Sequence, residues 1–327
     1  MTGLSPIGPR SVDVPSLVDQ AREGRARAVA RLISLVEDGH PALREVMALL
    51  APDAGRAHVV GVTGAPGVGK STTTNALVAA HRAAGHRVGV LAVDPSSPFS
   101  GGALLGDRIR MSDHAADPEV FIRSMASRGH LGGLSWAAPQ ALRVLDAAGC
   151  DVVLLETVGV GQSEVEVAGT ADTTVVLLAP GMGDGIQAAK AGILEVADVL
   201  VVNKADREGA DRTVRDLRHA ASMGAGTDPE GWRVPVVRTV ATDGTGVDDL
   251  LAAVEAHRGW LGIDGLRERR VRRAGREIEG LALEALRAKV GGLHGDTRLD
   301  SLADDVLAGR TDPYAAADHL VATLTAH

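Results

Sequence analysis

A single glycine-rich stretch constrains this chain more than any other part of the sequence. Residues 64–71 read GAPGVGKS and fit the P-loop pattern G-x-x-x-x-G-K-[ST] at every fixed position. The apolar run 58–63 precedes the stretch, and a helical pattern that includes Ala76, Leu77 and Ala80 follows it. Strand, glycine loop and helix in this order are the context in which such a loop binds phosphate, which disfavours a chance glycine-rich turn. The sequence therefore predicts a nucleoside triphosphate site.

The residue types of the loop suit anion binding. Glycines allow the backbone to turn its N–H groups toward phosphate oxygens, and the following helix adds the positive end of its dipole. We expect Lys70 to reach the β- and γ-phosphates and the Ser71 hydroxyl to ligate Mg²⁺. The predicted nucleotide contacts in this stretch are Gly64, Ala65, Pro66, Gly67, Val68, Gly69, Lys70, Ser71 and Thr72.

A second motif predicts which base is bound. Residues 203–206 read NKAD and follow the apolar run 198–203. In the N-K-x-D pattern the carboxylate, here Asp206, accepts hydrogen bonds from the N1–H and the exocyclic amine of guanine, which adenine cannot supply. The Lys204 stem is expected to cover the base, and Asn203 to tie this loop to the P-loop. The sequence predicts GTP and GDP, rather than ATP, as ligands.

A third segment is predicted to complete the base site. Thr239, Val240 and Ala241 follow the apolar run 234–238 and resemble the last guanine-contacting loop of GTPases. A backbone N–H is a suitable donor to the carbonyl oxygen of a base. We therefore expect the Ala241 N–H to meet the guanine oxygen.

Acidic residues near strand ends predict a metal site. Glu156 begins the sequence ETVG at the end of an apolar run, where GTPases usually carry Asp-x-x-Gly. Asp94 ends another such run, and Asp107 lies in a glycine-flanked segment. Each carboxylate alone is more often a helix cap or a solvated loop residue. Three of them in a chain with a P-loop predict, with Ser71, a shell for Mg²⁺ and its waters. The Gly159 N–H is expected to touch the γ-phosphate.

Composition excludes several classes of function. A net charge of −8 disfavours a nucleic-acid binder, whose phosphate contacts require a basic surface. The single cysteine, Cys150, excludes a disulfide within the chain and a cysteine-based metal cluster. Its place before an apolar run suggests a small packed side chain. No long uncharged apolar stretch is present, so we expect a cytoplasmic protein without a membrane segment.

The order of apolar patterns predicts an α/β fold. Residues 14–52 have helical periodicity, and short apolar runs then alternate with helical patterns. Such alternation predicts a doubly wound, mostly parallel sheet covered on both faces, with ligands at the carboxyl ends of its strands. After about residue 262 the strand pattern stops, and 266–290 reads as a charged helix followed by two short helical stretches. The predicted domains are an N-terminal helical extension (1–55), a nucleotide-binding domain (56–262) and a C-terminal helical arm (263–327).

With these residues in hand, the chain resembles the MeaB/ArgK/MMAA family, which belongs to the SIMIBI class of P-loop GTPases. The resemblance covers nearly the whole chain. The matching stretches are GAPGVGKST (64–72), LAVDPSSP (91–98), GDRIRM (106–111), FIRSMASRGHLGG (121–133), ETVGVGQSE (156–164), GMGDGIQAAKAGILEVAD (181–198) and NKAD (203–206).

The resemblance implies a function that the residues alone do not. Members of this family are GTPases that act as chaperones of adenosylcobalamin-dependent acyl-CoA mutases such as methylmalonyl-CoA mutase: they gate cofactor loading and protect the mutase from inactivation. It also implies that the C-terminal arm forms a homodimer, and that Asp184, Gln187 and Lys190 lie in a switch that contacts the partner. Gly185 departs from the pattern, because some members carry an acidic residue there.

The predicted reaction is in-line attack of water on GTP, with slow intrinsic turnover that the partner stimulates. No glutamine directly follows Gly159, and Gln162 lies three residues beyond it. The predicted catalytic set is Lys70, Asp107, Glu156 and Gly159. Two alternatives remain open with the same P-loop: a metal-insertion GTPase, which would need a Cys/His cluster, and a small-molecule kinase, which would transfer phosphate to an acceptor.

Overall fold

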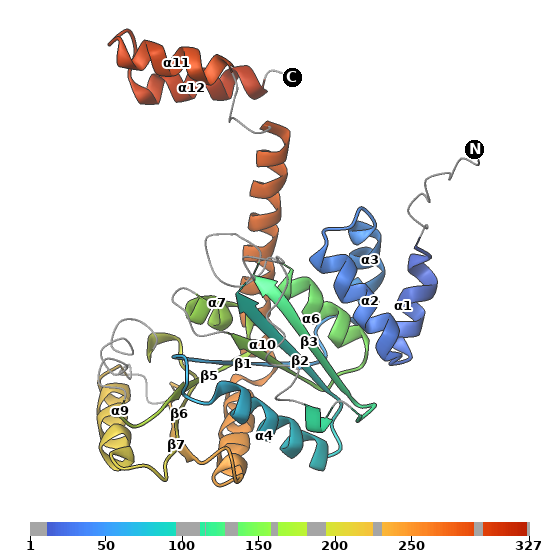
Figure 1. Ribbon diagram of the computed structural model, residues 1–327, viewed down its shortest axis with the longest axis vertical. Coiled ribbons are helices and arrows are strands. Elements are labelled where there is room, and N and C mark those ends of the chain that lie inside the picture. The colour runs from blue at the N-terminus through green and yellow to red at the C-terminus, as the bar shows by residue number, and fades with distance from the viewer. Residues whose placement is uncertain are drawn as a thin grey trace, which may run out of the picture. The chain divides into compact units, whose positions relative to one another are not determined.

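A seven-stranded, wholly parallel sheet organises the first part of the chain (Figure 1). The strand order is β3-β2-β4-β1-β5-β6-β7. The strands are β1 (His58–Gly64), β2 (Val88–Pro95), β3 (Val120–Ser127), β4 (Val152–Thr157), β5 (Thr173–Leu178), β6 (Val199–Asn203) and β7 (Val236–Thr239). The computed structural model describes residues 12–95, 112–114, 116–127, 137–157, 163–181, 194–224, 231–290 and 297–325. The predicted α/β fold with a parallel sheet is confirmed.

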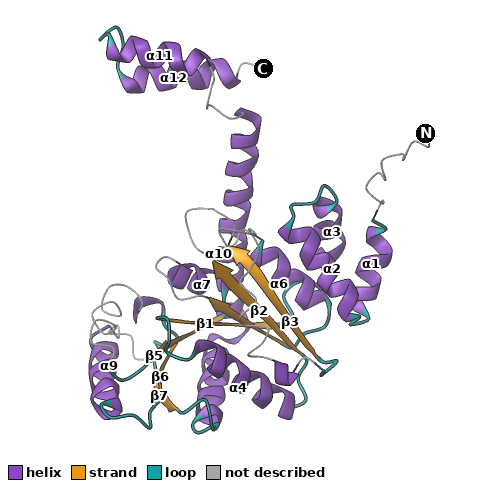
Figure 2. Cartoon of the chain, in the orientation of Figure 1, coloured by secondary structure: helices purple, strands orange, loops and turns teal. Residues whose placement is uncertain are grey.

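Helices cover both faces of this sheet, as Figure 2 shows by colour. Their bounds are α1 (Val14–Arg22), α2 (Ala26–Glu37), α3 (Leu43–Leu50), α4 (Lys70–Ala83), α6 (Ala138–Ala147), α7 (Ser163–Thr170), α9 (Ala210–Gly224), α10 (Val247–Val290), α11 (Thr297–Leu307) and α12 (Pro313–Thr325). Buried residues of α4 and of the first turns of α10 share one hydrophobic cluster, and those of α6, α7 and α9 belong to the clusters of the opposite face.

The pleat of the strands explains why both faces are apolar. Val60 and Val62 of β1 pack in the cluster with α4, whereas Val59 packs in the cluster with α6. Successive side chains of a strand point to opposite faces, so a strand covered on both sides needs an apolar residue at nearly every position. The continuous apolar runs of the sequence therefore become central strands.

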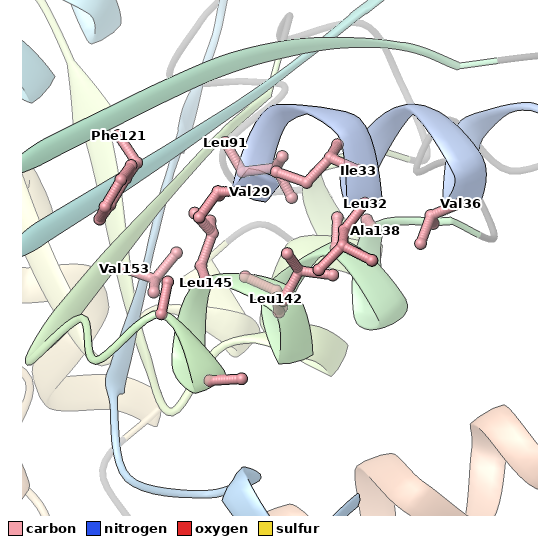
Figure 3. Packing of buried hydrophobic residues seen from close by; sticks show 14 of the residues in the cluster. Val29, Leu32, Ile33, Val36, Leu91, Phe121, Ala138, Leu142, Leu145 and Val153 are labelled. Carbon is pink, nitrogen blue, oxygen red and sulfur yellow. The ribbon is translucent and has the colours of Figure 1, made fainter. Parts of the chain in front are cut away.

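The N-terminal helices extend the layer that α6 forms on one face of the sheet. Figure 3 shows Leu32 of α2 beside Ala138 of α6, and Ile33 of α2 beside Leu91 of β2. Leu32 is fully buried, and the cluster continues to Phe121 of the edge strand β3. Arg123 of β3 also donates to Ser34 Oγ at 3.0 Å and pairs with Glu37 at 2.5 Å. The helical segment predicted for 14–52 thus packs on the sheet domain.

Two compact units divide the chain, residues 1–270 and 271–327. Helix α10 begins in the first unit at Val247 and contains one non-helical residue, Gly262, with φ 57° and ψ −164°. The helix predicted for 266–290 is the later part of this element, so the start of α10 was not predicted. In the second unit, α11 and α12 pack against each other. The proposed domain borders at 55 and 262 stay predictions.

Two further expectations concern single features of the chain. Cys150 is buried at the turn before β4, and burial raises the pKa of its thiol. Across the described residues, no helix combines the length and the apolar character that crossing a bilayer requires.

Candidate guanine-nucleotide site

The P-loop connects β1 to α4 in a conformation that needs glycine. Gly64, Gly67 and Gly69 have φ values of 142°, 80° and 99°, where side chains other than glycine are strained. A Cβ on Gly64 would lie 2.3 Å from the Leu177 carbonyl oxygen, and a Cβ on Gly69 would lie 2.3 Å from Asn203 Nδ2. The loop therefore lies directly against β5 and against the residue that ends β6. Around Gly67 a Cβ would meet nothing within 4 Å, so the backbone there has open space beside it.

Helix α4 starts at Lys70, immediately after the left-handed Gly69. The first N–H groups of a helix have no acceptor within the helix, so this start faces the loop with hydrogen-bond donors and the positive end of the dipole. The Lys70 side chain folds over the loop, and its Nζ donates to the carbonyl oxygens of Gly64 at 2.8 Å and Ala65 at 3.1 Å. The ammonium group thus lies against the backbone that is predicted to hold phosphate.

A hydroxyl and a carboxylate meet at the start of the same helix. Ser71 Oγ donates to Glu156 Oε1 at 2.6 Å, and both side chains are buried. Glu156 lies next to the carboxyl end of β4, the strand that neighbours β1. Next to it, Thr157 Oγ1 donates to Thr63 Oγ1 at 3.3 Å. The structure therefore brings together two of the four predicted metal ligands.

Asn203 joins three segments of the predicted nucleotide site. Its Nδ2 donates to the Val68 carbonyl oxygen in the P-loop at 2.8 Å. Its Oδ1 accepts from Thr239 Oγ1 and from the Ala241 N–H, both at 3.1 Å. Because the amide oxygen receives two donors, the orientation of the amide group is fixed. The P-loop, the NKAD loop and the loop after β7 are tied through one buried side chain.

The remaining residues of the NKAD loop also approach the P-loop. Lys204 has a positive φ of 56°, and its Nζ donates to the Gly67 carbonyl oxygen at 2.6 Å. Asp206 is exposed, which leaves its carboxylate accessible to a ligand. The Ala241 N–H points to Asn203, so a contact with a base oxygen requires this donor to be shared or redirected. That contact stays a prediction, as do the individual roles of Thr239 and Val240.

Several predicted site residues fall outside the part of the chain that the structure describes. These are Asp107, Gly159, Gln162, Asp184, Gln187 and Lys190. Asp94 lies in β2, next to its carboxyl end, but its side chain is not described. Among the described residues, no group of three or more His, Cys, Asp or Glu side chains is arranged to hold a metal ion.

Two features of the site were missed in the sequence. The P-loop approaches β5 closely at Gly64, which lies against the Leu177 carbonyl oxygen. The position of a backbone atom cannot be inferred from the pattern of residue types. The hydrogen bond from Thr239 to Asn203 joins residues on two neighbouring strands. Its only signal is the position of both residues at the ends of apolar runs, which predicts that they lie at the same edge.

The parallel sheet, the P-loop and the base-reading loop define the class: this is a P-loop GTPase. A model of the family described as methylmalonyl Co-A mutase-associated GTPase MeaB matches residues 29–293. The chain belongs to this family.

Similar proteins from other organisms are consistent with membership of this family. A putative GTPase of Pyrococcus abyssi is 46% identical over 310 residues, which cover 94% of this chain and 96% of that protein. GTPase ArgK of Escherichia coli is 38% identical over 72% of this chain and 73% of its own length. The mitochondrial methylmalonic aciduria type A homolog of Mus musculus is 37% identical over 76% of this chain and 63% of its own length.

A solved structure extends the likeness to the whole fold. The crystal structure of a protein described as LAO/AO transport system kinase superposes with a TM-score of 0.73 at 26% identity. The superposition covers 99% of both chains. The two proteins therefore share one fold, including the parallel sheet and its flanking helices.

Proposed function

We propose that this protein binds and hydrolyses GTP in order to gate the loading of adenosylcobalamin into an acyl-CoA mutase, such as methylmalonyl-CoA mutase, and to protect that mutase. The observation that carries the guanine-nucleotide part is the bonding of Asn203 to the P-loop and to the loop after β7. The family model, whose description names the mutase, supports the partner. The proposal places both proteins in the cytoplasm.

The guanine preference is assigned to Asp206. A carboxylate accepts the two donors that guanine presents side by side, and a site built for them rejects a base that lacks them. Asn203 and Lys204 position this loop, because their side chains are bonded to the carbonyl oxygens of Val68 and Gly67. The β- and γ-phosphates are assigned to the P-loop, where Lys70 and the start of α4 stabilise negative charge.

The donor set at the start of α4 fits a magnesium ion. A serine hydroxyl and a carboxylate oxygen lie 2.6 Å apart, and oxygen ligands of this kind are those that Mg²⁺ prefers, directly or through water. Ser71 and Glu156 would hold the ion, with Asp94 and Asp107 as further candidates. When bound, Mg²⁺ supplies charge neutralisation at the phosphates. Lys70 supplies a fixed positive charge for the leaving phosphate, and the Gly159 N–H is the proposed γ-phosphate contact.

Exposed apolar side chains in the second unit support a homodimer. Val271, Ile278, Leu281 and Leu286 of α10 are between 45% and 67% exposed, and their spacing places several of them along one side of the helix. Large apolar residues exposed in a row are typical of an interface with another chain. We assign this segment to a second copy, and we assign Gln162, Asp184, Gln187 and Lys190 to the contact with the mutase.

Single-turnover hydrolysis tests the proposal. Radiolabelled GTP is mixed with excess protein and Mg²⁺, with and without an adenosylcobalamin-dependent acyl-CoA mutase from the same host. We expect slow basal hydrolysis that the mutase accelerates at least tenfold, and no transfer of label to a small-molecule acceptor. A fast basal rate that the mutase leaves unchanged contradicts the chaperone role. Label transferred to an acceptor supports the kinase alternative.

A further inference from the structure

Two arginines of α10 bind residues at the amino end of the sheet, opposite the predicted nucleotide loops. Arg269 donates two hydrogen bonds to the Asp198 carboxylate, at 2.7 and 2.8 Å. Arg270 donates two to the Asp172 carboxylate, at 2.7 and 3.1 Å. Paired N–H donors on one carboxylate fix the geometry of both partners. Asp172 and Asp198 immediately precede β5 and β6. We call these two pairs the strand anchor.

The carboxylates of the strand anchor are buried, and each is paired with an arginine. Asp172 is 1% exposed and Asp198 is 6% exposed. Burial alone would raise the pKa of Asp198, but hydrogen bonds from His257 and Arg269 outweigh that effect and hold this pKa below its usual value. A buried charge without its partner is strongly unfavourable, so each aspartate depends on its arginine.

Backbone groups of β1, of β5 and of the residues just before β1 also bind the strand anchor. Asp172 accepts the Val59 N–H at 3.0 Å, and Asp198 accepts the Thr174 N–H at 2.8 Å. Arg270 donates to the carbonyl oxygens of Gly55 and Ala57, the two alternate residues before β1. The anchor thus fixes the starts of β1, β5 and β6 together.

Two of these strands, β1 and β6, lead into predicted nucleotide loops at their other ends, and β5 lies against one of these loops. β1 ends at Gly64, which approaches the Leu177 carbonyl oxygen of β5, and β6 ends at Asn203. β6 has five residues, so the anchor at Asp198 lies about 16 Å from Asn203 along the strand. Close-packed strands of this length transmit a displacement, because the interior has little free volume to absorb it.

We propose that Arg269 and Arg270 are positioning residues for the guanine-nucleotide site: through Asp198 and Asp172 they fix the strands that carry the P-loop and Asn203. This inference rests on the proposed function, because it concerns the same site. Val271, the first residue of the second unit, directly follows Arg270. A partner that binds the C-terminal unit and strains the chain at Arg270 is therefore expected to alter the affinity for nucleotide. By the same coupling, bound nucleotide is expected to alter the affinity for that partner.

The dissociation rate of GDP tests the anchor. The full-length protein is loaded with a fluorescent GDP analogue, and its release is followed after addition of excess GDP. We expect Arg269→Gln to raise the dissociation rate at least fivefold, because the strand that ends at Asn203 loses its fixed start. Arg269→Lys keeps the charge that Asp198 needs but not the paired geometry, and a smaller increase is expected. This second variant also serves if Arg269→Gln does not fold.

Two controls separate positioning from general instability. Arg267→Gln changes an exposed arginine on the same helix, and Leu32→Ala destabilises the N-terminal helices far from the site. Both are expected to release GDP within twofold of the wild-type rate. If the Arg269 variants also stay within twofold while their unfolding midpoints fall, the anchor is only structural and the inference is overturned. A wild-type protein that binds no guanine nucleotide overturns the proposed function itself.

Discussion

At the scale of residues, Asn203 and Gly69 depend on each other. The Asn203 amide reaches the Val68 carbonyl oxygen only because nothing but hydrogen occupies the side-chain position of Gly69. The φ of 99° at Gly69 adds a second reason for glycine, since other residues are strained there. The second glycine of the motif is thus required by sterics as well as by backbone conformation.

Replacement of Gly69 should lower the affinity for GDP by more than backbone strain alone would. Gly69→Ala places a Cβ 2.3 Å from Asn203 Nδ2. We expect GDP affinity to fall at least a hundredfold, and the free energy of unfolding to fall by about 1–3 kcal/mol from strain and overpacking. Calorimetric titration and urea unfolding measure the two quantities.

The control for backbone strain is Gly85→Ala. Gly85 has a φ of 84° and open space around its Cβ position. This variant is expected to lose stability but to keep GDP affinity within threefold of the wild type. Equal loss of affinity in both variants would refute the steric role of Gly69.

At the scale of elements, α7 lies unusually close to β1. A Cβ on Gly61 would lie 2.3 Å from Val167 Cγ1 and 2.9 Å from the Cβ of Ala171. The φ of Gly61 is not positive, so its glycine is required only by the approach of the helix.

A double-mutant cycle measures this contact. Gly61→Ala is expected to cost about 1–3 kcal/mol of unfolding free energy through overpacking. Val167→Ala is expected to cost a similar amount through the cavity that it leaves. The double variant should be more stable than the sum of the two changes predicts, because the new methyl group fills the space that Val167 vacates. Additive losses in urea unfolding would show that α7 moves away instead.

Much of the fold could be predicted from the sequence, and the reasons are local. Residues 152–155 (VVLL) of the run 151–156 are all apolar, and a strand buried on both faces requires this pattern. The motifs at 64–71 and 203–206 follow such runs, so their meeting at one edge of the sheet was predictable.

Other features depend on tertiary contacts that no local pattern reveals. The strand anchor joins Arg269 to Asp198, 71 positions apart, and the sequence indicated only a charged helix over this segment. The part of α10 before Gly262 was not predicted either, because the sequence indicated a helix only from residue 266 onward.

At the scale of the whole molecule, buried histidines link stability to pH. Burial lowers the pKa of His58 to about 4 and that of His81 to about 4. His58 bonds to Thr173, which in turn bonds to His257, at the starts of β1 and β5. The rings of His58 and His81 are therefore held neutral in the folded protein near neutral pH.

The free energy of unfolding should fall as the pH is lowered from 6.5 toward 4.5. In this range the unfolded chain binds protons on both histidines while the folded protein does not. The expected slope is about 1.4 kcal/mol per pH unit for each histidine. Urea unfolding at several pH values measures this slope. The variant His81→Gln should reduce it by about 1.4 kcal/mol per pH unit, the contribution of one histidine. Stability that stays constant over this range would contradict the burial of neutral rings.

The proposed function depends on guanine recognition at Asp206, which a comparison of GDP with ADP tests. The dissociation constants of GDP and ADP are determined by calorimetric titration of the purified protein with Mg²⁺ at one salt concentration. We expect GDP to bind at least a thousandfold more tightly than ADP, because adenine leaves the Asp206 carboxylate without its donors. Equal affinity for the two nucleotides, or binding of neither, would contradict it.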